Sequence, residues 1–90
     1  MINFNNLETF RTKITAGKTC IGFVVSLNDA TVSEMAGELG YDFTWIDMEH
    51  CSLNIETVLQ HVRAVKGSEC APFVRIKWNQ WGVIKPILDI

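Results

Sequence analysis

Three titratable side chains fall within four residues at the end of an apolar stretch. Residues 43–48, FTWIDM, have the composition of a buried strand, and Asp47, Glu49 and His50 stand at its end. A carboxylate that binds one imidazole nitrogen fixes the tautomer and raises the basicity of the ring, so that the other nitrogen can act as a general base near neutral pH. If the Asp47 side chain faces inward, a tight turn brings His50 to it, and the two residues are predicted to form a catalytic pair.

Arg75 is the fourth candidate, because it lies inside the apolar segment PFVRI at 72–76. A guanidinium in such a segment is costly unless it meets an anion, and its planar donors suit a carboxylate or enolate oxygen. Carboxylate, imidazole and guanidinium together indicate proton transfer beside an oxyanion, often with a divalent metal. Taken singly, each residue is more often a helix cap or a solvated loop residue, so the functional interpretation depends on the combination.

Apolar runs predict three strands, and the spacing of apolar residues predicts the helices between them. The strands are expected at 19–26, 43–48 and 72–76, the first of them apolar enough to be covered on both faces. Asn6, Asp29 and Asn54 are expected to cap helices, and Gly17 and Gly40 to end them. The predicted helices cover 6–16, 29–40, 54–67 and 81–89, the last despite Pro86. The apolar stripes expected to face the core are Val32, Met35, Ala36 and Leu39 in the second helix, and Ile55, Val58, Leu59 and Val62 in the third.

This order predicts an α/β fold, with a leading helix and three β/α units whose strands are parallel. Three parallel strands leave two bare edges, so residues 1–90 are interpreted as a single partial domain without an internal boundary. It would be the N-terminal portion of a (β/α)8 TIM barrel, which has about 250 residues. Because ligands bind at the carboxyl ends of such strands, Asp47, Glu49, His50 and Arg75 are predicted to surround one pocket.

Composition argues against several classes of protein. The net charge is −2 and no run of Lys or Arg could follow a phosphate backbone, so nucleic acid is not an expected partner. No apolar stretch reaches the ~20 residues of a membrane span, and the N-terminus lacks a signal-peptide pattern, so a cytoplasmic protein without a membrane partner is expected. The cysteines at 20, 51 and 70 suggest neither disulfides nor a metal site. His61 is interpreted as structural, and Trp78 and Trp81 as packing residues or pocket walls.

Three blocks of the sequence together resemble a known family. The stretches GYDFTWIDMEHCSLNIETV, APFVRIKWN and IKPILDI are similar to the HpcH/HpaI aldolase family, whose members show G-[FY]-D-x-x-x-[IL]-D-x-E-H, P-x-V-R and I-K-x-x-L-D blocks. The resemblance covers essentially all 90 residues in order and spacing. It implies a (β/α)8 barrel and a metal-dependent class II pyruvate aldolase, a carbon–carbon lyase that makes or cleaves 2-oxo-4-hydroxy acids with Mg²⁺, Mn²⁺ or Co²⁺.

The resemblance also implies a role for each candidate residue. His50 matches the base that acts on the substrate hydroxyl, Asp47 its orienting partner, and Arg75 the group that binds the pyruvyl oxygen and steadies the enolate. Glu49 is expected in the second shell of the metal. The family's metal ligands, a glutamate and an aspartate from later strands, would lie beyond Ile90, so this chain is expected to hold no metal and to be inactive alone. The complete enzyme is expected to be a homo-oligomer that binds pyruvate, or another 2-oxo acid, and an aldehyde.

Two other functions fit the same residues. One is a citrate-lyase-type carbon–carbon lyase on the same scaffold, acting on an acyl thioester. The other is a non-catalytic β/α fragment that pairs its open sheet edges with another chain.

Overall fold

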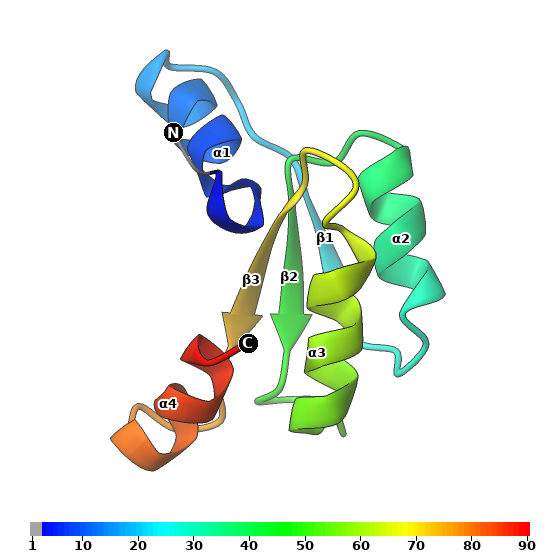
Figure 1. The fold of residues 1–90 in the computed structure, drawn as a ribbon, viewed down its shortest axis with the longest axis vertical. Helices are drawn as coiled ribbons and strands as arrows, with labels where there is room; N and C mark the ends of the chain where they lie inside the picture. The colour runs from blue at the N-terminus through cyan, green and yellow to red at the C-terminus, as the bar shows by residue number, and fades with distance from the viewer. Residues whose placement is uncertain (1–2) are drawn as a thin grey trace.

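The computed structural model describes residues 3–90 and contains one parallel sheet with the order β1-β2-β3 (Figure 1). The three strands alternate with helices along the chain, and a short 3-10 turn, η1, precedes the first helix. The predicted fold class is confirmed. The elements are η1 (Phe4–Asn6), α1 (Leu7–Thr15), β1 (Gly22–Val25), α2 (Thr31–Glu38), β2 (Phe43–Asp47), α3 (Ile55–Ala64), β3 (Ala71–Arg75) and α4 (Trp81–Leu88).

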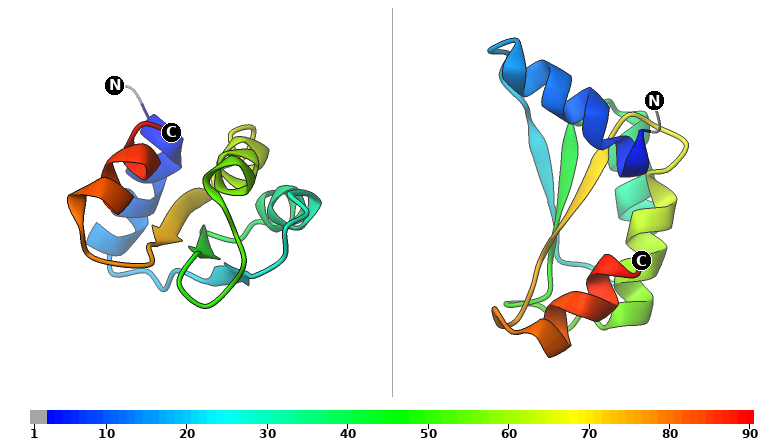
Figure 2. Two further views of the ribbon diagram at one scale, coloured as in Figure 1. Left: turned by 90° about the horizontal axis from the view of Figure 1, so that it is seen from below. Right: turned by 60° about the vertical axis from the view of Figure 1, so that its left-hand side comes forward.

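The core lies between the sheet and the helices α2 and α3, which pack side by side over one of its faces (Figure 2). Val25 of β1, Ile46 of β2 and Val58 of α3 are completely buried there. Burying an aliphatic side chain of this size stabilises a fold by about 1.5–3 kcal/mol. This layer therefore fixes the positions of β1 and β2.

The opposite face of the sheet is only partly covered. Phe10 of α1 makes edge-to-face contacts with Phe43 and Phe73, at ring-centroid distances of 5.7 and 5.0 Å. Farther along the strands, Val24 is 64% exposed and Trp45 40% exposed. The prediction that the first strand is covered on both faces is therefore wrong for the described residues. In a closed barrel, side chains from opposing strands fill this face, and nothing in residues 3–90 takes their place.

An ion pair holds α1 at the amino ends of the strands, at the end of the sheet opposite the candidate site (Figure 1). Lys13 pairs with Asp42, whose other carboxylate oxygen accepts a hydrogen bond of 2.8 Å from the backbone of Ile21. The hydrogen bond from Lys13 lowers the pKa of Asp42, with a further contribution from the Ile21 N–H. The pair therefore stays charged and joins α1 to the loops before β1 and β2.

Helix α2 buries a different stripe from the one that the sequence predicted. Met35 and Leu39 are 53% and 73% exposed, whereas Ser33 and Ala36 are buried. A Cβ on Gly37 would lie 2.8 Å from Ser68 Oγ, so the contact between α2 and the segment after α3 requires small residues. Close packing of the two helices has therefore taken precedence over burial of the largest apolar side chains.

One of the three predicted helix caps is present: Asn54 accepts a hydrogen bond of 2.9 Å from the backbone of Thr57. The N-cap of α2 is Ala30 and not Asp29, although the Asp29 carboxylate accepts a hydrogen bond of 3.0 Å from the Thr31 N–H. Asn6 does not cap α1. Its backbone has a φ of 63°, and its buried side chain donates to the carbonyls of Val65 and Cys70, at 3.1 and 2.7 Å. Buried carbonyl groups require donors, so the amide of Asn6 satisfies a distant segment instead of its own helix.

His61 is completely buried and has a hydrogen-bond partner at each ring nitrogen. Nε2 donates to the carbonyl of Leu27 at 2.8 Å, and Nδ1 accepts from the hydroxyl of Ser33 at 2.6 Å. Burial lowers the pKa of His61, so the ring is neutral at pH 7. The residue links α3 to α2 and to the loop after β1, which agrees with the structural interpretation.

Helix α4 forms in spite of Pro86, as predicted. Trp78 and Trp81 are both exposed, so neither packs into the core formed by residues 3–90. No helix among residues 3–90 has the length and apolar character needed to cross a membrane.

Candidate active site

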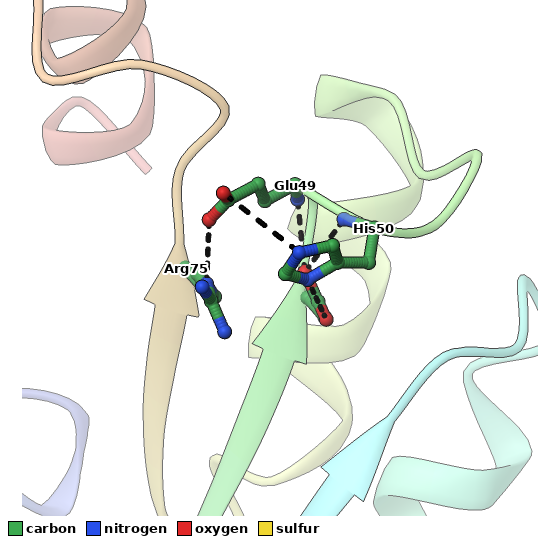
Figure 3. Close-up of polar contacts among 4 residues, drawn as sticks. Glu49, His50 and Arg75 are labelled. Atoms are coloured by element: carbon green, nitrogen blue, oxygen red, sulfur yellow. Dashed lines mark hydrogen bonds and ion pairs between the residues drawn. The ribbon is translucent and has the colours of Figure 1, made fainter.

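A tight turn after β2 brings His50 to the carboxylate of Asp47, and Figure 3 shows His50 on this turn. Asp47 Oδ1 accepts hydrogen bonds from the backbone N–H groups of Glu49, at 2.9 Å, and His50, at 3.0 Å. Asp47 Oδ2 lies 3.2 Å from Nδ1 of His50. The carboxylate is nearly buried, whereas the imidazole is 58% exposed and therefore accessible from solvent.

The turn also keeps Asp47 ionised. The hydrogen bond from the His50 backbone lowers the pKa of Asp47, and the contacts with the imidazole and with the Glu49 N–H lower it further against the opposing effect of burial. In the neutral imidazole, a carboxylate that accepts from Nδ1–H selects the tautomer in which Nε2 carries no proton. This is the arrangement that a general base requires.

Replacing Asp47 by Asn is expected to reduce the loss in free energy of unfolding that occurs as the pH is lowered. Because the pKa of Asp47 is lowered in the folded state, its contribution is present above the unfolded value of about 3.9 and is lost as the pH falls through the folded value. Free energies of unfolding from urea titrations between pH 7 and about 3 would measure this. The variant should lose less stability over this range than the unmodified chain, and parallel curves would contradict the prediction. Asp42→Asn, at the opposite end of the sheet, should remove a separate part of the pH dependence of the free energy of unfolding, and the effects of the two substitutions should add.

Arg75 and Glu49 form the second half of the site. Asp47 and Arg75 are register partners in β2 and β3, so both lie on the same face at the carboxyl ends of the strands. Arg75 Nε donates to Glu49 Oε2 at 2.6 Å, and Glu49 Oε1 lies 3.8 Å from Nε2 of His50. Figure 3 shows Glu49 between Arg75 and His50. The four predicted side chains therefore converge, but in this structure the anion that meets Arg75 is Glu49.

A pocket of about 410 Å³ opens beside these residues. Lys77 and Trp78, from the loop after β3, form one part of its wall. Of the two predictions for Trp78, a packing residue or a pocket wall, the structure supports the pocket wall. Lys77 was not identified from the sequence, although its place two residues after Arg75 on the same rim is a signal that could have found it. The remaining lining residues are Met48, Glu49, His50, Cys51 and Ser52.

Cys70 and Cys51 lie in different environments. Cys70 is buried, and burial raises the pKa of its thiol to about 11, so it remains protonated. Cys51 is half-buried in the pocket wall.

The carboxylates of this site do not by themselves fit a metal ion. Within residues 3–90, no group of three or more His, Cys, Asp or Glu side chains could hold one. Asp47 is engaged by the His50 turn, and Glu49 by Arg75. The chemistry that these residues can supply is therefore proton transfer and anion binding.

The fold and the site define a parallel β/α protein of the TIM-barrel class, with an aspartate–histidine pair and a guanidinium at the carboxyl ends of adjacent strands. No family model matches the chain. A hydroxypyruvate/pyruvate aldolase of Agrobacterium fabrum is 35% identical over 89% of this chain and 30% of its own length, and a 4-hydroxy-2-oxo-heptane-1,7-dioate aldolase of Escherichia coli is 33% identical over 92% and 32%. The solved structure of a HpcH/HpaI aldolase/citrate lyase family protein from Burkholderia cenocepacia superposes with a TM-score of 0.73 and 29% identity, over 78% of this chain and 28% of that one.

The resemblance to the HpcH/HpaI aldolase family is thus confirmed over about nine-tenths of the chain. The chain spans about a third of the length of the curated relatives it matches.

Proposed function

We propose that this chain supplies the acid–base and anion-binding half of a class II pyruvate aldolase site, in a carbon–carbon lyase that acts on 2-oxo-4-hydroxy acids. The observation that carries the proposal is the convergence of the Asp47–His50 pair and Arg75 on one rim of the sheet. The aldolase names of the similar proteins support it. The small-molecule partners would be a 2-oxo acid such as pyruvate and an aldehyde.

In the cleavage direction, His50 Nε2 removes the proton of the C4 hydroxyl. The C3–C4 bond then breaks, the oxygen at C4 becomes the carbonyl of the aldehyde, and the bonding electrons move to the C2 oxygen as an enolate. Arg75 donates hydrogen bonds to the developing anion from its Nη groups, for which the described residues provide no hydrogen-bond partner. The proton that His50 removed from the hydroxyl is then transferred to C3 of the enolate. This step gives pyruvate and returns His50 to its neutral form.

The remaining features of the proposal concern the complete protein. Mg²⁺, Mn²⁺ or Co²⁺ would be held by residues other than these four, because the carboxylates described here are engaged elsewhere. The resemblance implies a place for Glu49 at the water shell of that ion, whereas in this structure Oε2 of Glu49 accepts a hydrogen bond from Arg75. A homo-oligomer in the cytoplasm is part of the same proposal.

The test compares the isolated chain with a chimera in which it replaces the corresponding segment of the Agrobacterium aldolase. Pyruvate release from a 4-hydroxy-2-oxo acid is measured with Mg²⁺ or Mn²⁺ added. The chimera should turn over and the isolated chain should not. Turnover by the chain alone would contradict the proposal that it supplies only half of the active site. A cooperatively folded but inactive chimera would contradict the aldolase assignment.

The family description of the Burkholderia structure also favours a second candidate, a citrate-lyase-type enzyme. The same base and guanidinium would act on an acyl thioester whose cleavage also yields an enolate. Faster turnover of a citryl thioester than of a 4-hydroxy-2-oxo acid by the chimera would establish this alternative.

The uncovered sheet face around Val24 and Trp45 is the observation that favours a third candidate, a non-catalytic chain that assembles with another. Size-exclusion chromatography of the 90-residue chain separates this reading from the first two. A monomer that unfolds cooperatively would argue against it.

A further inference from the structure

The ion pair between Glu49 and Arg75 points to a role for Glu49 that differs from a place around a metal. We propose that Glu49 is a positioning residue, which holds the Arg75 guanidinium by Nε so that its two Nη groups face the carboxylate or enolate of a 2-oxo acid. The inference rests on the proposed function only for the identity of that anion.

The atoms of the pair support this assignment. A guanidinium is planar and has five N–H donors, one on Nε and four on the Nη atoms. The contact of 2.6 Å uses the Nε donor, so it fixes the plane of the group and leaves the Nη edge for a second anion. Planar pairing of that edge with a carboxylate is the strong, bidentate kind of contact.

Glu49 is itself held in place. Its backbone N–H donates to Asp47 Oδ1 at 2.9 Å, within the same turn that places His50. The side chains of Arg75 and Glu49 are 43% and 39% exposed, so without the pair the arginine would be free to sample other rotamers. Ordering one such side chain on binding weakens affinity by about tenfold at most, and this is the loss that Glu49 prevents.

Electrostatics alone makes the opposite prediction, and the sign of the effect therefore tests the proposal. A carboxylate beside Arg75 repels a ligand anion, so its removal would tighten binding if Glu49 were only a nearby charge. If Glu49 instead bound the water molecules around a metal ion, its removal would affect anion binding only when the metal is present. Positioning predicts weaker anion binding without any metal.

The experiment is a titration of the 90-residue chain with oxalate, a planar mimic of the pyruvate enolate, in buffer that contains a chelator. Binding is followed by the side-chain Nε–Hε resonance of Arg75 in NMR spectra. Glu49→Ala should weaken binding by up to about tenfold and broaden the Arg75 signal. Glu49→Gln keeps an acceptor for Nε without the charge, so it should bind as tightly as the unmodified chain or more tightly. Glu56→Ala, an exposed position of α3, is the matched control and should change nothing.

Several outcomes would overturn the proposal. These are binding by Glu49→Ala at full strength or tighter, an equal loss in Glu49→Gln, an effect that appears only after Mn²⁺ is added, and no binding of oxalate by the unmodified chain. The titrations do not depend on turnover. An inactive chimera would therefore count against the proposed function and leave this inference standing.

Discussion

Replacing His50 by Ala in the chimera is expected to lower kcat by about 10²–10⁴-fold, the usual contribution of a positioned general base. Nε2 of His50 is the only imidazole nitrogen that the described residues present at this rim, because the other histidine, His61, is buried with both nitrogens bonded. The loss should fall on kcat more than on KM, since the proton moves in the transition state.

Ser52→Ala is the matched control for His50, because Ser52 lines the same pocket without a described hydrogen bond to the pair. It should retain turnover within a few-fold. A kcat in His50→Ala above about a tenth of the parent value would exclude His50 as the base.

Replacing Arg75 by Ala is expected to lower kcat/KM by about 10²–10³-fold, as removal of an oxyanion donor does. Arg75→Lys should recover only part of this loss, because an ammonium keeps the charge and loses the planar pair of donors. Separate measurement of kcat and KM would show whether the guanidinium acts on the enolate or only on the bound substrate.

The Arg75 variants leave Glu49 unpaired, so the double variant with Glu49→Gln is needed to separate that effect. Arg63→Ala, on the exposed surface of α3, provides the control for loss of a positive charge. Equal activity of Arg75→Lys and the parent would contradict the bidentate role.

Local patterns were sufficient for most of the fold. Apolar runs predicted the three strands, and Asn54 and Gly40 marked helix ends because a cap bonds only to residues next to it in the chain. The contact between Asp47 and His50 was predictable for the same reason, since a spacing of three residues lets one turn close it. The catalytic roles of these residues remain predictions.

The sequence was less informative about contacts between residues that are far apart in the chain. Asn6 was expected to cap α1 and instead satisfies carbonyls near the end of α3, and the stripe of Met35 and Leu39 lies outside the core. In both cases the decisive contact is with another element, whose position depends on packing and not on local periodicity.

By itself, the sequence determined an alternating parallel β/α chain and an imidazole–carboxylate pair at the end of its second strand, because periodicity, caps and short spacings act within a few residues. Only the tertiary structure decided that Glu49 binds Arg75, and that Lys77 and Trp78 share a pocket with His50. Those contacts depend on the register that sets Asp47 beside Arg75, and burial of Ile46 and Val74 against the same hydrophobic cluster favours that register.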